Sequence, residues 1–377
     1  MSLTPFYPTE RDDAVGCFVA EPLQELARSG VTHTIFVAQP FYRAVPVSNP
    51  TAPAAVSVRY FSLPAGTGLS TAGAFLYAHL LAKARRAHDI RKIDVIHAHG
   101  PLPCGHAAML LARELGVPYV VTVHGLDAYS TRQVKGLAGE WCRRITQRVF
   151  ASARRVIAIS EHVRGQVAAG GVRARTSVVY NGVNAELFSA PEDGLQSECS
   201  ILSVGNLIPT KGHRTLLRAV AAIRPDFREL KVSIIGDGPE RGALIELAKA
   251  LRIADCVEFG GRVSRRTMAR ALQKCALFVL PSSYEGLGCV YLEAMSAGKA
   301  AIGCRGQGIE EVMQHGLNGW LVGADAVEEL AAGLSTLMRK SDLRQSIGHQ
   351  ARQTILKGFT LRHQAEALLR IYRECVK

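Results

Sequence analysis

Short runs of apolar, β-branched residues alternate with helix-length segments along the whole chain. In the first half these runs lie at residues 32–39, 94–100, 119–125, 155–160 and 177–182. In the second half they lie at residues 199–205, 231–238, 256–261, 276–282 and 299–304. Strands that are apolar throughout and separated by helices form parallel sheets covered on both faces. The pattern therefore predicts an α/β fold with two doubly wound, Rossmann-like domains.

A polar segment containing proline and glycine separates the two series of strands. We expect a first domain over residues 1–185, a linker over 186–199 and a second domain over 200–360. In doubly wound domains, ligands bind beyond the carboxyl ends of the strands. The polar residues that follow each apolar run are therefore the candidate site.

The chain carries a formal net charge of +13, with basic residues concentrated at 81–92 and 132–155. Such stretches indicate an anionic partner, which is an acidic lipid surface, a phosphate-bearing substrate or nucleic acid. A solvated basic face without a partner is the alternative. The sequence has no nucleic-acid-binding motif and only 6% aromatic residues, which argues against nucleic acid.

The nine cysteines form no CxxC pair, and residues 1–13 contain no basic segment followed by an apolar stretch. Both observations favour reduced thiols and a cytoplasmic protein. The apolar runs are far shorter than the roughly 20 residues of a membrane-spanning helix. Any contact with a membrane is therefore expected to be peripheral, on its inner face.

Residues 281–303, PSSYEGLGCVYLEAMSAGKAAIG, place two glutamates on either side of a glycine-rich turn that leads into an apolar helix. Gly286 and Gly288 allow the backbone to approach a ligand, and the helix N-terminus favours an anion such as phosphate. Glu293 lies too deep in the helix to be a capping residue, so its carboxylate would accept hydrogen bonds from ribose hydroxyls. Glu285 would meet a sugar hydroxyl or a developing positive charge. The alternative is an exposed Glu285 and a salt-bridged Glu293.

Two further segments are candidates for phosphate binding. Lys211 lies at the start of a helix, where its charge would suit a phosphate, and an exposed lysine is the alternative. Because Lys211 precedes Gly212, the order is wrong for a P-loop. In VSIIGDGPERG, residues 232–242, the glycines are spaced one residue too widely for a dinucleotide fingerprint, an alternative that would use Glu258 as the ribose ligand.

Polar residues also follow buried strands in the first half of the chain. His124 would contact a substrate hydroxyl or move a proton, and Asp127 would orient it or meet an acceptor. A second group comprises His97, His99, Cys104 and His106. Its spacing fits no zinc pattern, so we interpret it as structural. The chain contains no DxD motif, and we expect no metal site.

These motifs resemble those of the retaining family 4 glycosyltransferases with the GT-B fold, over nearly the whole chain. The matching segments include TPFYPTERDDAVG (4–16), VTVHGLD (121–127), SVGNLIPTKGH (203–213), PSSYEGLGCVYLEAM (281–295) and GQGIEEVM (306–313). The spacing of Glu285 and Glu293 is the most specific element. Within the family, the third and fifth segments are most similar to the branch that builds cell-surface polysaccharides, such as teichuronic-acid-type enzymes.

The resemblance implies a role for each matching residue in the second domain. Glu293 would bind the nucleotide ribose, Glu285 would lie at the donor sugar and Lys211 would bind the diphosphate. The other donor-binding positions that it implies are Asn206, Arg262, Val263, Gly286, Leu287, Gly288 and Cys289. No metal or cofactor is expected to be essential.

For the first domain, the resemblance implies that His124 contacts the donor sugar across a cleft between the domains. Gly16 would belong to a loop over the donor or acceptor, and Asp127 would lie on the acceptor side. The last helix, residues 361–377, would cross back onto the first domain, as in the GT-B fold.

One departure from the family concerns the diphosphate site. The family commonly has arginine where this chain has Asn206. Losing a charged hydrogen bond typically costs about 1.5–3 kcal/mol, so Arg262, Arg305 or a divalent ion would have to compensate, or turnover would be slow. Gln307 also replaces a second glycine that is usual beside Gly308.

The resemblance thus implies transfer of a sugar from a UDP- or GDP-sugar to a hydroxyl group of a lipid-linked or polysaccharide acceptor. The pathway would be cell-surface glycan biosynthesis. The alternative is a transferase-like protein that binds a nucleotide or polyanion with little turnover.

Overall fold

The computed structural model describes residues 1–10, 12–43, 52–64, 66, 68–125, 127–128, 134–171, 174–190 and 199–376. The chain forms two compact domains, Met1–Asn181 together with Arg362–Lys377, and Gly182–Leu361. Of the expected linker, residues 191–198 lie outside the described ones, and residues 186–190 group with the second domain, as do residues 182–185 of the expected first domain.

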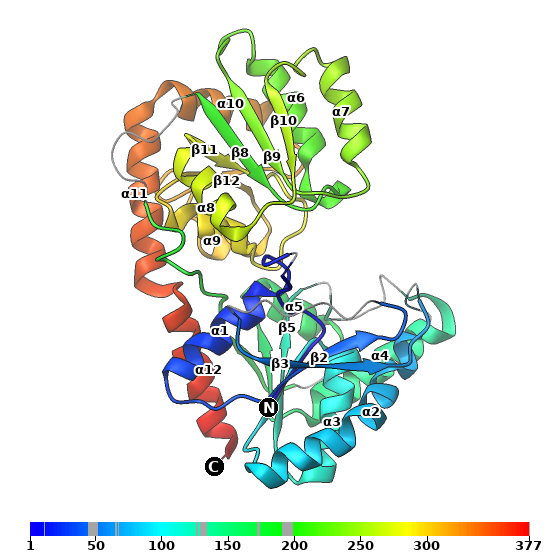
Figure 1. Ribbon diagram of the computed structural model, residues 1–377. Helices are drawn as coiled ribbons and strands as arrows, with labels where there is room; N and C mark the ends of the chain where they lie inside the picture. The colour runs from blue at the N-terminus through cyan, green and yellow to red at the C-terminus, as the bar shows by residue number, and fades with distance from the viewer. Residues whose placement is uncertain are drawn as a thin grey trace. The chain divides into compact units, whose positions relative to one another are not determined.

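A parallel sheet of seven strands forms the centre of the first domain (Figure 1). Its strands are β1 (Ser2–Thr4), β2 (Ile35–Pro40), β3 (Ala55–Tyr60), β4 (Ile96–His99), β5 (Tyr119–Val123), β6 (Arg155–Ala158) and β7 (Thr176–Val178). Their order is β3-β2-β1-β4-β5-β6-β7. Although β1 has three residues, it lies centrally, with Ser2 paired to Ile35 of β2 and to His97 of β4.

Helices connect these strands and supply the apolar faces that cover the sheet. They are α1 (Cys17–Arg28), α2 (Leu69–Ile90), α3 (His106–Leu115), α4 (Gly136–Ser152) and α5 (Glu161–Ala169), with an irregular turn at Pro101–Gly105. Local sequence determines where helices start: Ser160 caps α5 by accepting the Val163 N–H at 3.1 Å.

The second domain has a parallel sheet of six strands in the order β10-β9-β8-β11-β12-β13. Its strands are β8 (Ser200–Val204), β9 (Lys231–Ile235), β10 (Val257–Gly261), β11 (Leu277–Val279), β12 (Ala300–Cys304) and β13 (Trp320–Val322). Its helices are η3 (Pro209–Lys211), α6 (His213–Ile223), α7 (Arg241–Ala250), α8 (Arg265–Lys274), α9 (Cys289–Ser296), η4 (Gly308–Glu311), α10 (Val327–Arg339) and α11 (Ser341–Gly358). The prediction of two doubly wound domains is confirmed.

The last helix, α12 (Leu361–Val376), belongs to the first domain and confirms the expected return of the chain. Leu368 and Ile371 are buried in the same apolar cluster as Leu23 and Ile157. The Tyr372 hydroxyl lies 2.5 Å from Nδ1 of the buried His97. Among the described helices, none combines the length and the hydropathy that a membrane span requires.

We expect Leu368→Ala to destabilise the first domain by about 2–3 kcal/mol, because it removes buried methyl groups and leaves a cavity. The measurement is the free energy of unfolding in urea. Leu356→Ala on α11 is the control, since Leu356 is 40% exposed. Equal effects of the two substitutions would contradict the docking of α12 as a stabilising contact.

Candidate active site

The glycine-rich turn between β11 and α9 contains the two predicted glutamates. Gly288 has φ 86° and precedes the first residue of α9. A Cβ at this position would lie 2.5 Å from the Tyr291 ring, so only glycine fits. The turn therefore brings the backbone N–H groups at the start of α9 next to Glu285, an arrangement that favours an anion.

Glu285 is buried and ion-paired, so the alternative of an exposed Glu285 is wrong. Its Oε1 accepts hydrogen bonds from Lys211 Nζ at 2.6 Å and from Ser282 Oγ at 3.0 Å. Its backbone N–H donates to Gln307 Oε1 at 3.0 Å. Gln307, noted in the sequence only as a departure from the family, thus holds the turn in place through its side chain.

Lys211 ends the short helix η3, and its side chain is 20% exposed. The next residue, Gly212, has φ 71°, and a Cβ there would lie 2.0 Å from the Pro281 carbonyl oxygen. This close approach of two backbone segments places the ammonium group beside the α9 turn. Lys211 and Glu285 therefore lie together. The alternative, in which Lys211 is an isolated exposed lysine, does not agree with the structure.

Glu293 lies inside α9 and is buried. Its Oε1 accepts a hydrogen bond from Arg265 Nη1 at 2.7 Å, and both side chains are less than 10% exposed. The Arg265 guanidinium also lies 5.0 Å from the centre of the Phe188 ring. Burial raises the pKa of Glu293, and the charge of Arg265 opposes that rise. Glu293 is thus salt-bridged, which is the alternative that the sequence left open. Its partner, Arg265, is a residue that the sequence analysis did not single out.

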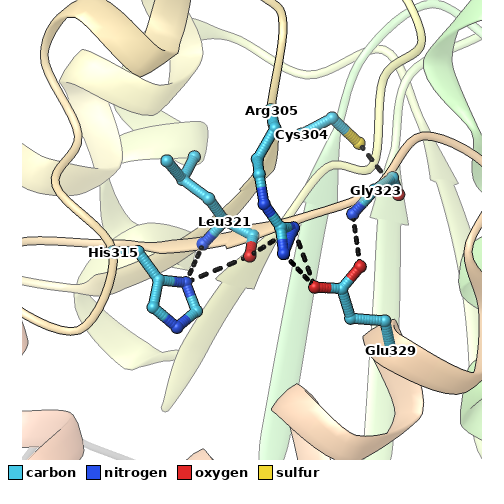
Figure 2. Close-up of polar contacts among 6 residues, drawn as sticks. All are labelled: Cys304, Arg305, His315, Leu321, Gly323 and Glu329. Atoms are coloured by element: carbon cyan, nitrogen blue, oxygen red, sulfur yellow. Dashed lines mark hydrogen bonds and ion pairs between the residues drawn. The ribbon is translucent and has the colours of Figure 1, made fainter.

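Three other predicted donor positions lie in loops at the ends of β8 and β10. Asn206 and Arg262 are exposed, and Val263 is half-buried. Arg305, a candidate to compensate for Asn206, is engaged elsewhere (Figure 2): Glu329 Oε1 accepts from its Nη1 at 2.7 Å, and Glu329 Oε2 accepts from the Gly323 N–H. Because Arg305 already neutralises Glu329, its compensating role is not supported.

Three histidines of the first domain form a stack. The ring centres of His97 and His99 are 4.5 Å apart, and those of His99 and His124 are 5.4 Å apart. His99 Nδ1 lies 3.2 Å from His124 Nε2, and His97 Nε2 lies 2.6 Å from Thr122 Oγ1. Burial lowers the pKa of His97 to about 3 and that of His124 to about 4, so both rings are neutral at pH 7. The interpretation of His97 and His99 as structural agrees with this packing.

Asp127 orders the loop that contains His124. Its Oδ1 accepts the His124 backbone N–H at 2.9 Å, whereas its Oδ2 is buried without a hydrogen-bond partner among the described residues. Burial raises the pKa of Asp127 to about 6. The carboxyl group thus supports the loop backbone directly.

Gly16 precedes α1 with φ 72°, and a Cβ there would lie 2.4 Å from the Tyr7 backbone nitrogen. It therefore requires glycine. Two residues further on, the Phe18 ring packs edge-on against the His124 ring, with centres 4.8 Å apart. The segment after Gly16 thus forms one wall of the His124 environment.

The alternative sites are not supported. In the part of the chain that the structure describes, no group of three or more His, Cys, Asp or Glu side chains is placed to hold a metal ion. The glycines of the dinucleotide-like segment have a packing role, because a Cβ at Gly236 would lie 1.9 Å from the Gly205 carbonyl oxygen and one at Gly238 would lie 2.5 Å from that of Leu207. Glu258, the ribose ligand of that alternative, is exposed on β10.

Two doubly wound domains with the last helix returned to the first define the GT-B class of fold. Residues 15–187 match the family model "Glycosyltransferase Family 4", and residues 192–354 match "Glycosyl transferases group 1". The chain belongs to the GT-B glycosyltransferases.

Individual relatives agree with this assignment. The chain is 29% identical to the D-inositol 3-phosphate glycosyltransferase of Frankia alni, over 100% of this chain and 98% of the relative. It is 28% identical to the uncharacterized glycosyltransferase MJ1178 of Methanocaldococcus jannaschii, over 75% of this chain and 76% of the relative. HepE of Anabaena, whose structure contains UDP and glucose, has the same fold with a TM-score of 0.75 and 20% identity, over 99% of this chain and 100% of HepE.

Proposed function

We propose that this glycosyltransferase moves a sugar from a UDP- or GDP-sugar to a hydroxyl group of a lipid-linked or polysaccharide acceptor in cell-surface glycan biosynthesis. The observation that carries the proposal is the Lys211 ammonium group, 2.6 Å from buried Glu285 and next to the N-terminus of α9. This arrangement suits a diphosphate beside a sugar. The complex of HepE with UDP-glucose, a neighbour by fold, supports a nucleotide-sugar donor.

In this proposal the donor is bound by the second domain. Lys211 and the backbone N–H groups from Leu287 to Cys289, in the turn that leads into α9, bind the diphosphate. Glu285 accepts from a sugar hydroxyl, and Glu293 accepts from the ribose hydroxyls while Arg265 keeps it ionised. The backbone at Arg262 and Val263 flanks the base.

In the first domain, His124 contacts the transferred sugar through its ring, while Asp127 holds the loop that carries it. Neutral His124 can donate or accept a hydrogen bond, because burial lowers its pKa to about 4. Gly16 belongs to the segment that packs against this histidine through Phe18.

The proposed reaction retains the configuration of the anomeric carbon. The acceptor hydroxyl attacks that carbon on the face from which the phosphate departs, the bond between the carbon and the phosphate oxygen breaks, and the acceptor proton passes to the departing phosphate. Catalysis then depends on positioning and on stabilising charge at the diphosphate. Lys211 and the helix N-terminus supply positive charge, so the proposal includes no metal or cofactor.

We expect UDP or GDP to raise the melting temperature, and ADP and NAD to have no such effect. A nucleotide at 100 times its dissociation constant stabilises the folded state by about 2.7 kcal/mol. Glu293→Gln should abolish the shift, because the amide no longer provides two acceptor oxygens for the ribose. Arg265→Lys is the matched variant, since it replaces the guanidinium group but keeps a positive charge beside the carboxylate, which stays ionised.

Retention of the shift in Arg265→Lys alone would support the ribose role of Glu293. Equal loss in both variants would instead show that the pair acts as a structural unit. If the wild-type protein responds to no nucleotide, a sugar-nucleotide donor is excluded. If it binds a nucleotide but hydrolyses and transfers no sugar, the alternative of a binding protein with little turnover, with Asn206 as its first cause, is favoured.

A further inference from the structure

Helix α4 presents an unusual face to solvent. Its buried residues include Cys142, Ile145, Val149 and Phe150. On the opposite side, Leu137 and Trp141 are 91% and 54% exposed, and Arg144 and Arg148 are also exposed. These four residues follow one another at spacings of four, three and four, so they form a single line along the helix, which we call the α4 stripe.

The apolar end of the α4 stripe is more exposed than its residue types predict. The exposed fraction of Leu137 is the highest among the large hydrophobic residues that the structure describes. Trp141 is one of only two tryptophans in the chain, and the other, Trp320, is half-buried in the second domain. Because large apolar side chains in water are unfavourable, two of them adjacent on one helix indicate a surface that is covered in use.

Basic residues flank this apolar end. Lys135 directly precedes α4 and is exposed, and Arg144 and Arg148 continue the line beyond Trp141. One acidic residue, Glu140, lies beside Trp141, but it is paired with Arg143 at 2.7 Å and with Arg144 at 3.0 Å. The local charge is therefore positive, in keeping with the net charge of +13.

We propose that the α4 stripe docks on the surface of an anionic lipid bilayer. A helix that lies in the membrane interface combines tryptophan and leucine on its apolar part with lysine and arginine that contact lipid phosphates. Leu137 and Trp141 enter the headgroup region, and Arg144 and Arg148 bind phosphate groups beside it (α4 in Figure 1). This proposal extends the proposed function and rests on it, because a lipid-linked acceptor is found at such a surface.

The test uses tryptophan fluorescence with vesicles. In the full-length Trp320→Phe variant, emission comes from Trp141 alone. We expect vesicles of phosphatidylglycerol and phosphatidylcholine to shift this emission to shorter wavelength, and vesicles of phosphatidylcholine alone to leave it unchanged. An unchanged emission with both kinds of vesicle would overturn the proposal.

Flotation with the same vesicles measures the contribution of the basic residues. We expect Arg144→Gln with Arg148→Gln to weaken binding about 30-fold, at roughly tenfold for each 1.4 kcal/mol. The matched control is Arg266→Gln with Arg270→Gln, two exposed arginines at the same spacing on α8. Equal weakening by both pairs would show a response to net charge alone and would overturn docking by this helix.

Two further outcomes separate this proposal from its competitors. If the protein self-associates without lipid, and Trp141→Ser with Leu137→Ser abolishes that association, a second copy covers the stripe and membrane docking is wrong. Nucleotide-induced thermal shifts are measured on the same variants. Normal shifts without vesicle binding would overturn the docking proposal alone, whereas vesicle binding without nucleotide shifts would leave docking intact and remove the proposed function.

Discussion

Replacing Lys211 with alanine is expected to lower kcat about 100- to 1,000-fold, the usual effect of removing one charge-stabilising group from a preorganised site. The ammonium group is 2.6 Å from Glu285, and its side chain is only 20% exposed, so solvent cannot fully replace it. Asn206 stands where the family commonly has arginine, and Arg305 is paired with Glu329, so neither position adds a free positive charge beside Lys211. The measurement is steady-state sugar transfer or donor hydrolysis.

Lys249→Ala is the control for this prediction. Lys249 lies in the same domain, and its side chain is 60% exposed and paired with Glu246, which is 71% exposed. We expect its kcat to equal that of the wild-type protein. A Lys211→Ala enzyme that is fully folded by circular dichroism and retains its kcat would show that Lys211 does not act on the leaving group.

Acidification is expected to destabilise the first domain more than the second. Each buried histidine of the stack has an unfolded-state pKa near 6.5, whereas in the folded state the pKa is about 3 for His97, about 4 for His124 and well below 6.5 for His99. Below pH 6.5 the unfolded chain therefore binds more protons than the folded one. Each histidine lowers the free energy of unfolding by roughly 1.4 kcal/mol per pH unit as the pH falls from 6.5 towards 4.

Other groups modify this slope in known directions. The lowered pKa of His33, about 4, acts in the same direction as the stack. The raised pKa of Asp127, about 6, acts in the opposite direction, because its folded carboxyl group binds a proton first, and it offsets about one histidine. In the second domain, His213 also has a pKa of about 4. Acidification therefore lowers the free energy of unfolding of the second domain through one buried histidine.

Urea unfolding at pH 7 and pH 5 checks this prediction. Trp141 reports on the first domain and Trp320 on the second, so Trp→Phe variants at either position separate the two transitions. We expect His99→Asn to reduce the pH dependence of the first transition, and His349→Asn, at an exposed position of α11, to leave it unchanged. Identical pH dependence of the two transitions would show that the histidine stack is not the cause.

Each of the ten apolar runs that the sequence predicted overlaps a strand. Eight of these ten strands are central in their sheets, and central parallel strands are buried on both faces and require this pattern. Three strands lie outside these runs: β1, which is central but has only three residues, and β3 and β13, at the edges of their sheets. Along β3, exposed Val56 and Arg59 interrupt the buried positions, and β13 has only three residues. An edge strand has one neighbour and more solvent contact, which weakens its sequence signal, although the other two edge strands, β7 and β10, were predicted.

By itself, the sequence determined the class of fold, the glycine-rich turn before α9 and the residue types of the candidate site, because strand periodicity and the conformational needs of glycine are local properties. Only the tertiary structure decided which charges meet. Glu293 pairs with Arg265, and Glu285 with Lys211, a residue 74 positions away in the chain. The same holds for His97 and Tyr372, 275 positions apart. The order of strands in a sheet determines which polar groups come together, and burial makes an unpaired charge costly. Neither is a property of the local sequence.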